Sequence, residues 1–391
     1  MKAKSQSTYE RVPYLVTFEE PTRSKDTYGG EIGRVVLKAH LLRPRDRPSR
    51  TVLVFMHPIG GGEYLPMPVA LAVAGHHVIY CSSRYLGNDT ALIMEKVVID
   101  LGACVRDARE RLGYERVVLA GWSGGGSLSA FYQGQAERPT VTATPAGDPP
   151  DLVAARLPPA DALMLLAAHV SRATTLTEWL DASILDERDP DRRDPQLDLY
   201  DPAGPNQPPY SAEFMARYRA AQIARTRRIT GWVRDKLQSL RDRGRGEEEF
   251  AFIVHGTMAD PRWLDPTLDA NDRKPRWCFL GEPHIVNMSP IGLARFCSLR
   301  SWLSQWSYDD SNANGPKCAA RIKAPILIVA NSADDGCPPS HGKALYDAIS
   351  HNDRELVTIQ GANHYYFNQP DKAREGAEVC FNWMQRHRFV G

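Results

Sequence analysis

Short apolar segments alternate with longer amphipathic segments along most of the chain. The apolar run Thr-Val-Leu-Val-Phe-Met at 51–56 is typical of a strand buried on both faces of a sheet. The same pattern predicts strands at 14–18, 35–42, 51–56, 77–81, 117–120, 162–167, 325–330 and 355–359. Because helical segments separate most of these strands, we expect an α/β fold with a mostly parallel central sheet flanked by helices.

Turn and capping residues mark where helices lie between the strands. A helix over 68–74 is followed by Gly75, which suits its C-terminal end. Asp89 and Thr90 are expected to cap a long helix that reaches Leu112. Further helices are predicted at 127–135, 211–240, 340–349 and 371–386.

The alternation breaks over residues 171–320. This segment is first irregular and rich in Pro and Asp, then helical, and then carries a tract of Arg, Gly and Glu at 241–249. Alternation resumes at 325–330. We therefore predict one α/β core formed by residues 1–170 and 321–391, interrupted by a large, mainly helical cap insertion at 171–320.

Overall charge and hydropathy exclude several classes of partner. The 391 residues carry a formal net charge of +1, so no strong field attracts nucleic acid or a membrane surface. No apolar stretch approaches the ~18 residues of a membrane span, and residues 1–11 contain no apolar region of signal-peptide length. We expect a small-molecule substrate as the partner, and the sequence leaves a homo-oligomer open.

Cysteine usage indicates the compartment and the metal content. The seven cysteines are odd in number, scattered and without a C-x-x-C pair, which argues against a disulfide framework and a structural zinc site. A reducing, cytoplasmic location fits this pattern best. No H-E-x-x-H motif or paired Cys/His cluster suggests a catalytic metal, so we expect neither a metal nor a cofactor.

A glycine-rich turn follows the strand at 117–120. The sequence Gly121-Trp122-Ser123-Gly124-Gly125 joins this strand directly to a helix, which is the context of a G-x-S-x-G nucleophile elbow. The flanking glycines let strand and helix approach closely around a strained serine. The Ser123 hydroxyl would then lie at a helix N-terminus, which favours negative charge. The motif alone leaves an ordinary glycine-rich turn open as the alternative.

A serine nucleophile needs a base, and the base needs an orienting acid. His364 is the strongest base candidate, because it lies in a loop just beyond the last predicted strand. The loop after the preceding strand supplies two carboxylates, Asp334 and Asp335. The chain order is therefore serine, aspartate, histidine.

With this elbow and this order, the chain resembles the α/β-hydrolase superfamily, specifically serine hydrolases with a large cap insertion. The resemblance covers the chain outside the insertion. Proteins of the family often place the acid four residues before a proline, and Asp334 has that relation to Pro338. The resemblance thus favours Asp334 over Asp335, and it implies a Ser123–His364–Asp334 triad that needs no cofactor.

The family also implies an oxyanion hole, in which preset donors meet the charge of the tetrahedral intermediate. One donor is the backbone N–H of Gly124, which follows the nucleophile. The second comes from the loop His-Pro-Ile-Gly-Gly-Gly at 57–62, where Pro58 cannot donate because it has no N–H. Ile59 is therefore the preferred second donor and Gly60 the next. We expect His57 to be a structural loop histidine.

The insertion holds six of the eight tryptophans: Trp179, Trp232, Trp263, Trp277, Trp302 and Trp306. These rings either line a pocket for a bulky apolar compound or build the core of the insertion itself. Trp122 and Arg172 are the candidate substrate-binding residues. Arg172 follows a strand of the sheet and would bind a polar substrate group or pair with aspartates of the insertion.

Together these features predict a carboxylic ester hydrolase. Its substrate would be an ester, thioester or lactone of a mid-sized hydrophobic compound, cleaved through an acyl-enzyme. A carbon–carbon bond hydrolase or an acyltransferase would use the same triad. A ligand-binding protein on a hydrolase scaffold is the non-catalytic alternative.

Overall fold

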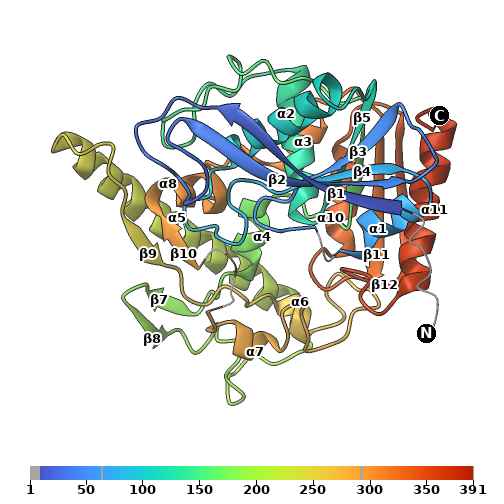
Figure 1. The fold of residues 1–391 in the computed structure, drawn as a ribbon. Coiled ribbons are helices and arrows are strands. Elements are labelled where there is room, and N and C mark those ends of the chain that lie inside the picture. The colour runs from blue at the N-terminus through green and yellow to red at the C-terminus, as the bar shows by residue number, and fades with distance from the viewer. Residues whose placement is uncertain (1–8, 63–64, 291–292, 294, 391) are drawn as a thin grey trace, which may run out of the picture.

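The computed structural model describes residues 9–62, 65–290, 293 and 295–390. Residues 1–8, 63, 64 and 391 of the predicted core and residues 291, 292 and 294 of the predicted cap lie outside this description. Among the described residues, eight strands form one sheet in the order β1-β2-β4-β3-β5-β6-β11-β12 (Figure 1). The strands are β1 (Tyr9–Glu19), β2 (Arg34–Pro44), β3 (Thr51–Phe55), β4 (His77–Cys81), β5 (Arg116–Trp122), β6 (Ala162–Leu166), β11 (Ile326–Ala333) and β12 (Arg354–Asn363).

The sheet is mostly parallel, as the alternation of strands and helices predicts. β2 is antiparallel to β1 and β4, and every pair from β4 to β12 is parallel. All five residues of β3, β4 and β6 are buried, which explains their continuous apolar sequences. Because the six parallel strands end at one edge, the loops that follow them meet there.

Helices cover both faces of the sheet. The helices are α1 (Pro66–Val73), α2 (Met94–Glu110), α3 (Gly124–Glu137), α9 (Gly315–Ala319), α10 (Pro339–Ala348) and α11 (Pro370–Arg386). Along β3, Val52 and Val54 belong to the apolar cluster that includes residues of α2, α3, α9 and α10, whereas Leu53 and Phe55 belong to the cluster that includes residues of α1 and α11. Successive side chains of β3 thus point to opposite faces of the sheet, and the core forms one layer on each face.

The predicted N-terminal cap of α2 is wrong. The helix begins at Met94, with Ile93 in the extended N-cap conformation, rather than at Thr90. The Asp89 carboxylate instead accepts a hydrogen bond from Arg172 at 2.6 Å. A tertiary ion pair has therefore displaced the local capping interaction that the sequence favours.

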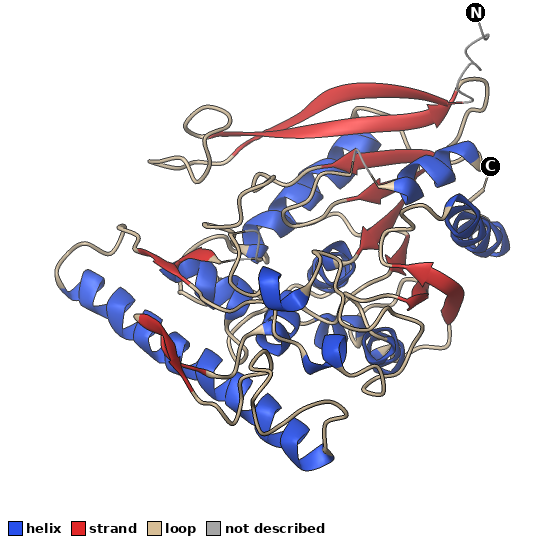
Figure 2. Ribbon diagram, turned by 90° about the horizontal axis from the view of Figure 1, so that it is seen from below, coloured by secondary structure: helices blue, strands red, loops and turns tan. Residues whose placement is uncertain are grey.

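Between β6 and β11 the chain leaves the sheet. This segment contains α4 (Arg172–Trp179), β7 (Ile184–Asp186), β8 (Asp189–Arg193), α5 (Ala212–Asp242), β9 (Ala251–Ile253), α6 (Pro261–Leu264), α7 (Pro283–Val286), β10 (Phe296–Ser298), α8 (Leu299–Ser301) and a π-helix, Trp302–Trp306. None of its described strands joins the main sheet, and the 31-residue α5 lies apart from that sheet in both views (Figure 2).

The segment has apolar clusters of its own. One contains Trp302 and Trp306, whose rings stack with centroids 5.1 Å apart, together with residues of α4 and α5. A second lies around Tyr218 and Phe214 of α5. The exact division into a core and a cap at 171–320 stays a prediction. No helix in the described ranges has the length and apolar character required to cross a membrane.

Candidate active site

Ser123 occupies a strained turn between β5 and α3. Its φ of 51° and ψ of −117° lie in a region that side chains other than glycine rarely adopt. A β-carbon on Gly121 would lie 2.2 Å from the Gly125 carbonyl oxygen, and one on Gly125 would lie 2.4 Å from the Met56 carbonyl oxygen. Only glycine fits at both positions, and the turn holds Ser123 at the start of α3.

His364 follows the end of β12, and the structure places it beside Ser123. Its Nε2 atom lies 3.1 Å from Ser123 Oγ, and its Nδ1 atom lies 2.9 Å from each carboxylate oxygen of Asp334. Because a carboxylate only accepts hydrogen bonds, Nδ1 carries the proton and Nε2 is free to accept one from the serine. This is the geometry of a nucleophile, a general base and an orienting acid.

Asp334 is completely buried just after β11, where two backbone amides hold it. Its Oδ1 atom accepts hydrogen bonds from the N–H groups of Gly336 at 2.8 Å and Cys337 at 2.7 Å. Asp335, the other predicted candidate, is bound through its backbone carbonyl, which accepts a hydrogen bond from Trp263 Nε1 at 2.6 Å. Of the two aspartates, the structure brings Asp334 to His364.

Charges around the imidazole favour its protonated form. Burial lowers the pKa of His364, but attraction to Asp334 and the hydrogen bond with it prevail, and the pKa is raised overall. Burial and the neighbouring Asp334 raise the pKa of Asp335 to about 7. An imidazolium that forms when His364 accepts a proton is thereby stabilised.

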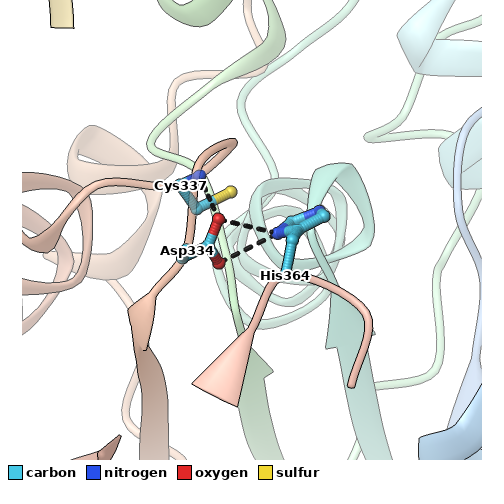
Figure 3. Close-up of side chains that lie close together, drawn as sticks. All are labelled: Asp334, Cys337 and His364. Carbon is cyan, nitrogen blue, oxygen red and sulfur yellow. Dashed lines mark hydrogen bonds and ion pairs between the residues drawn. The ribbon is translucent and has the colours of Figure 1, made fainter. Parts of the chain in front are cut away.

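Cys337 lies beside the pair of Asp334 and His364 (Figure 3). One ligand-type atom from each of the three side chains lies within 4.8 Å of the others. Burial raises the pKa of the Cys337 thiol well above its ordinary value, which favours the protonated thiol beside the triad. All seven cysteines are buried free thiols.

In the loop at 57–62, the two predicted backbone donors are hydrogen-bonded to the side chain of His57. The N–H groups of Ile59 and Gly60 both donate to His57 Nδ1, at 3.2 and 2.9 Å. The loop folds back on its own first side chain, so both N–H groups already have an acceptor. That Ile59 or Gly60 supplies the second oxyanion donor stays a prediction, and the hydrogen bonds of both amides to His57 weigh against it. His57 does support the loop, as expected of a structural histidine.

Gly124 begins α3, where backbone N–H groups have no partner inside the helix. A β-carbon on Gly124 would lie 2.8 Å from His57 Nε2 and 3.1 Å from His169 Nε2, so two imidazoles converge on this glycine. The sequence reasoning missed His169. Its position could have indicated a place in the site, because His169 lies three residues after the end of β6, the strand next to β5, at the edge where the parallel strands end.

A cavity of about 350 Å³ opens onto Ser123 and His364. Its wall is mostly apolar and includes Ile59, Leu65, Tyr80, Leu86, Trp122, Leu176, Trp179, Phe279, Leu280 and Leu293. Of the six tryptophans between β6 and β11, all of which the structure describes, Trp179 lines this cavity. Trp302 and Trp306 build the core of their own segment instead.

The two predicted substrate-binding residues both border the cavity. The Trp122 indole packs against the His364 ring with centroids 6.3 Å apart. Arg172 is buried, and it donates to Asp89 Oδ2 and to Gln305 Oε1, each at 2.6 Å. Its ion-pair partner thus comes from the loop before α2, not from an aspartate between β6 and β11. The guanidinium reaches the cavity with its charge already balanced.

Known proteins resemble this chain over a short stretch of sequence and, in solved structures, over nearly the whole fold. No protein-family model matches the chain. Two curated relatives, both named "Uncharacterized 31.7 kDa protein in traX-finO intergenic region" of Escherichia coli, are 36% identical over 69 residues. That match covers 18% of this chain and only 24% of the length of each relative.

Solved structures match nearly the whole chain. The alpha/beta hydrolase GrgF from Penicillium sp. sh18 has a TM-score of 0.52 at 11% identity, with 96% of this chain and 99% of that chain covered. The esterase domain of a Rhodothermus marinus protein has a TM-score of 0.47 at 15% identity, with 96% and 98% covered. The strand order and the GrgF match identify this fold as the α/β-hydrolase fold, in agreement with the resemblance seen in the sequence.

Proposed function

We propose that the protein is a serine hydrolase that cleaves an ester, thioester or lactone through an acyl-enzyme. The observation that carries this proposal is the chain of contacts from Ser123 Oγ to His364 Nε2 and from His364 Nδ1 to Asp334. These three side chains meet at the strained turn of Ser123, on the edge of a cavity in which a carbonyl carbon can approach the serine oxygen.

In the proposed reaction His364 accepts the proton of Ser123 as the serine oxygen attacks the carbonyl carbon. Asp334 keeps the imidazole in the required tautomer and stabilises the imidazolium. The imidazolium then gives its proton to the leaving group, and the acyl-enzyme forms. A water molecule, deprotonated by His364, attacks the acyl-enzyme and releases the acid and free Ser123.

The cavity supports a mid-sized, hydrophobic substrate. Its volume of about 350 Å³ is at the lower end of the range for small-molecule sites, and its wall is mostly apolar. Trp179 and Phe279, which come from the predicted cap, form part of that wall with ring centroids 5.5 Å apart. We propose on this basis that residues 171–320 act as a cap that shapes the acyl site.

Labelling of the purified protein with a fluorophosphonate probe tests the nucleophile. Ser123→Ala should abolish rapid labelling, whereas Ser340→Ala, a matched change on the exposed face of α10, should not. Absence of labelling in the unmodified protein would contradict the proposal and favour a ligand-binding role.

A panel of esters, thioesters, lactones, amides and β-diketones tests the reaction. We expect cleavage of apolar esters, thioesters or lactones to their acids. Cleavage of diketones without esters would indicate a carbon–carbon hydrolase, and excess transfer product with an added alcohol or amine would indicate an acyltransferase.

A further inference from the structure

We propose that the imidazole of His57, rather than a backbone N–H of its loop, is the second oxyanion donor beside Gly124. This inference rests on the proposed function and adds a catalytic residue to it.

The hydrogen bonds of His57 fix which ring nitrogen carries the proton. Nδ1 accepts from the backbone N–H groups of both Ile59 and Gly60, so it must present a lone pair. In the neutral ring the proton then lies on Nε2. Burial, followed by the charges of Arg172 and His364, lowers the pKa of His57 to about 3. The ring therefore stays neutral, with Nε2–H as a donor, throughout the range in which a serine hydrolase works.

The position of Nε2 suits an oxyanion. His57 lines the same cavity as Ser123, and its Nε2 atom would lie 2.8 Å from a β-carbon on Gly124. None of the described residues is hydrogen-bonded to this Nε2–H; both bonds of the ring are made at Nδ1. A preset donor in a largely apolar cavity, next to the N-terminal amide of α3, is what stabilises negative charge as it develops.

Residues 58–60 of the loop offer no unoccupied backbone N–H that could bind the oxyanion in place of His57. Pro58 has no N–H, and the N–H groups of Ile59 and Gly60 point at His57. When Ser123 attacks, the electron pair of the carbonyl moves to its oxygen, and the hydrogen bonds from Nε2–H and Gly124 N–H shorten. The proton stays on His57, because a neutral imidazole is far too weak an acid to release it.

Two substitutions at His57 separate this role from loop support. In His57→Asn the side-chain oxygen can still accept from Ile59 and Gly60, but no atom reaches the place of Nε2. In His57→Gln a donor can reach that place, but the loop loses its acceptor. The inference predicts that His57→Asn lowers kcat on the order of 10²–10³-fold with KM changed less than about threefold, and that His57→Gln retains more activity.

Binding of a trifluoromethyl ketone analogue of an accepted ester should weaken in parallel with kcat in His57→Asn. A matched control is His351→Asn, which lies between α10 and β12 at the opposite ends of the strands and should behave as the unmodified enzyme. Equal losses in the two His57 variants, or more activity in His57→Asn than in His57→Gln, would overturn the inference and indicate a backbone donor such as Gly61.

Nitrogen-15 NMR of the histidines in the unmodified protein keeps the inference testable if a variant fails to fold. At pH 7 His57 should show the Nε2–H tautomer, and its Nε2–H signal should shift when the ketone binds. A proton on Nδ1, or no shift, would overturn the inference. If the unmodified protein neither reacts with fluorophosphonate nor cleaves any ester, the proposed function itself fails, and that result is distinct from an active enzyme that tolerates His57→Asn.

Discussion

His364 Nε2 lies 3.1 Å from Ser123 Oγ, although 241 positions separate the two residues in the chain. Both follow strands of one parallel array, β5 and β12, with β6 and β11 between them. Parallel strands deliver the loops at their carboxyl ends to one edge of the sheet. Ser123 and His364 therefore meet although they are far apart in sequence, because each lies in a loop at the same edge of the sheet.

The carboxylate that orients His364 can be identified by a matched pair of variants. Asp334→Asn removes the acceptor for Nδ1–H and should lower kcat on the order of 10³–10⁴-fold, because the imidazole loses its required tautomer. Asp335→Asn should reduce kcat less than about tenfold. Steady-state kinetics on one ester measures both, and a larger loss in Asp335→Asn would show that the acid has been misassigned.

Activity should fall at acid pH because a protonated His364 cannot accept the serine proton. Burial lowers the pKa of His364, but Asp334 and, to a smaller extent, Asp335 raise it, and the net result is a pKa above the ordinary 6.5. The acid limb of kcat/KM should therefore have its midpoint above 6.5. Asp335, whose own pKa is about 7, is partly ionised at this pH, and Asp335→Asn removes that partial negative charge, so the midpoint should move to lower pH. A midpoint that stays in place or rises in this variant would contradict the electrostatic account.

Asp335 should also make the fold less stable as the pH rises. Burial and Asp334 raise the pKa of Asp335 to about 7, so the folded state holds its proton more tightly than the unfolded state does. The free energy of unfolding should therefore fall as the pH rises from about 4, the pKa of Asp335 in the unfolded chain, to about 7, its pKa in the folded protein. Asp335→Asn should raise the free energy of unfolding by roughly 1–3 kcal/mol at pH 8 and by little at pH 4.

Denaturant unfolding of both proteins at pH 4 and pH 8 measures this difference. If Asp335→Asn raised the free energy of unfolding by the same amount at pH 4 and at pH 8, the cause would be better packing of the amide and not the ionisation of Asp335.

The sheet and the three residues of the site could be read from the sequence for physical reasons. Strands such as β3 are buried on both faces, so they appear as continuous apolar runs. The turn at Ser123 tolerates only glycine at Gly121 and Gly125, and this requirement leaves a visible motif. The position of His364 after the last strand follows from the chain order that the fold imposes.

Features set by tertiary contact could not be read in this way. Asp89 resembles a helix cap in sequence, but its partner Arg172 lies 83 positions away. The turning of the Ile59 and Gly60 amides toward His57 depends on the path of the loop, which no local pattern encodes. Short strands such as β7 and β9, of three residues each, carry too few positions for a hydrophobic period.

Gly124→Ala should produce a folded but impaired enzyme. Its new β-carbon would lie 2.8 and 3.1 Å from two imidazole nitrogens, those of His57 and His169, which can move aside. Displacement of these rings should lower kcat more than about tenfold with little change in melting temperature. In Gly121→Ala the clash is with the backbone of Gly125 at 2.2 Å, so that variant should lose stability first. Thermal unfolding and kinetics on both variants check the contrast.

The size of the acyl group accepted should depend on Trp179. This ring is buried on the cavity wall and packs against Trp263 and Phe279, each with centroids 5.5 Å away. Trp179→Phe keeps the wall apolar but makes it smaller, so the cavity deepens by more than the volume of a methylene group. One methylene in an apolar pocket changes kcat/KM by roughly tenfold or more.

The ratio of kcat/KM for a long-chain over a short-chain ester should therefore rise at least about threefold in Trp179→Phe. Trp232→Phe is the matched control, because that ring is 40% exposed and packs against Phe250 and Phe252 away from the cavity. A similar change of the ratio in both variants would mean that chain length is sensed elsewhere. An unchanged ratio in Trp179→Phe would place the acyl chain against another wall, the one formed by Leu65 and Tyr80.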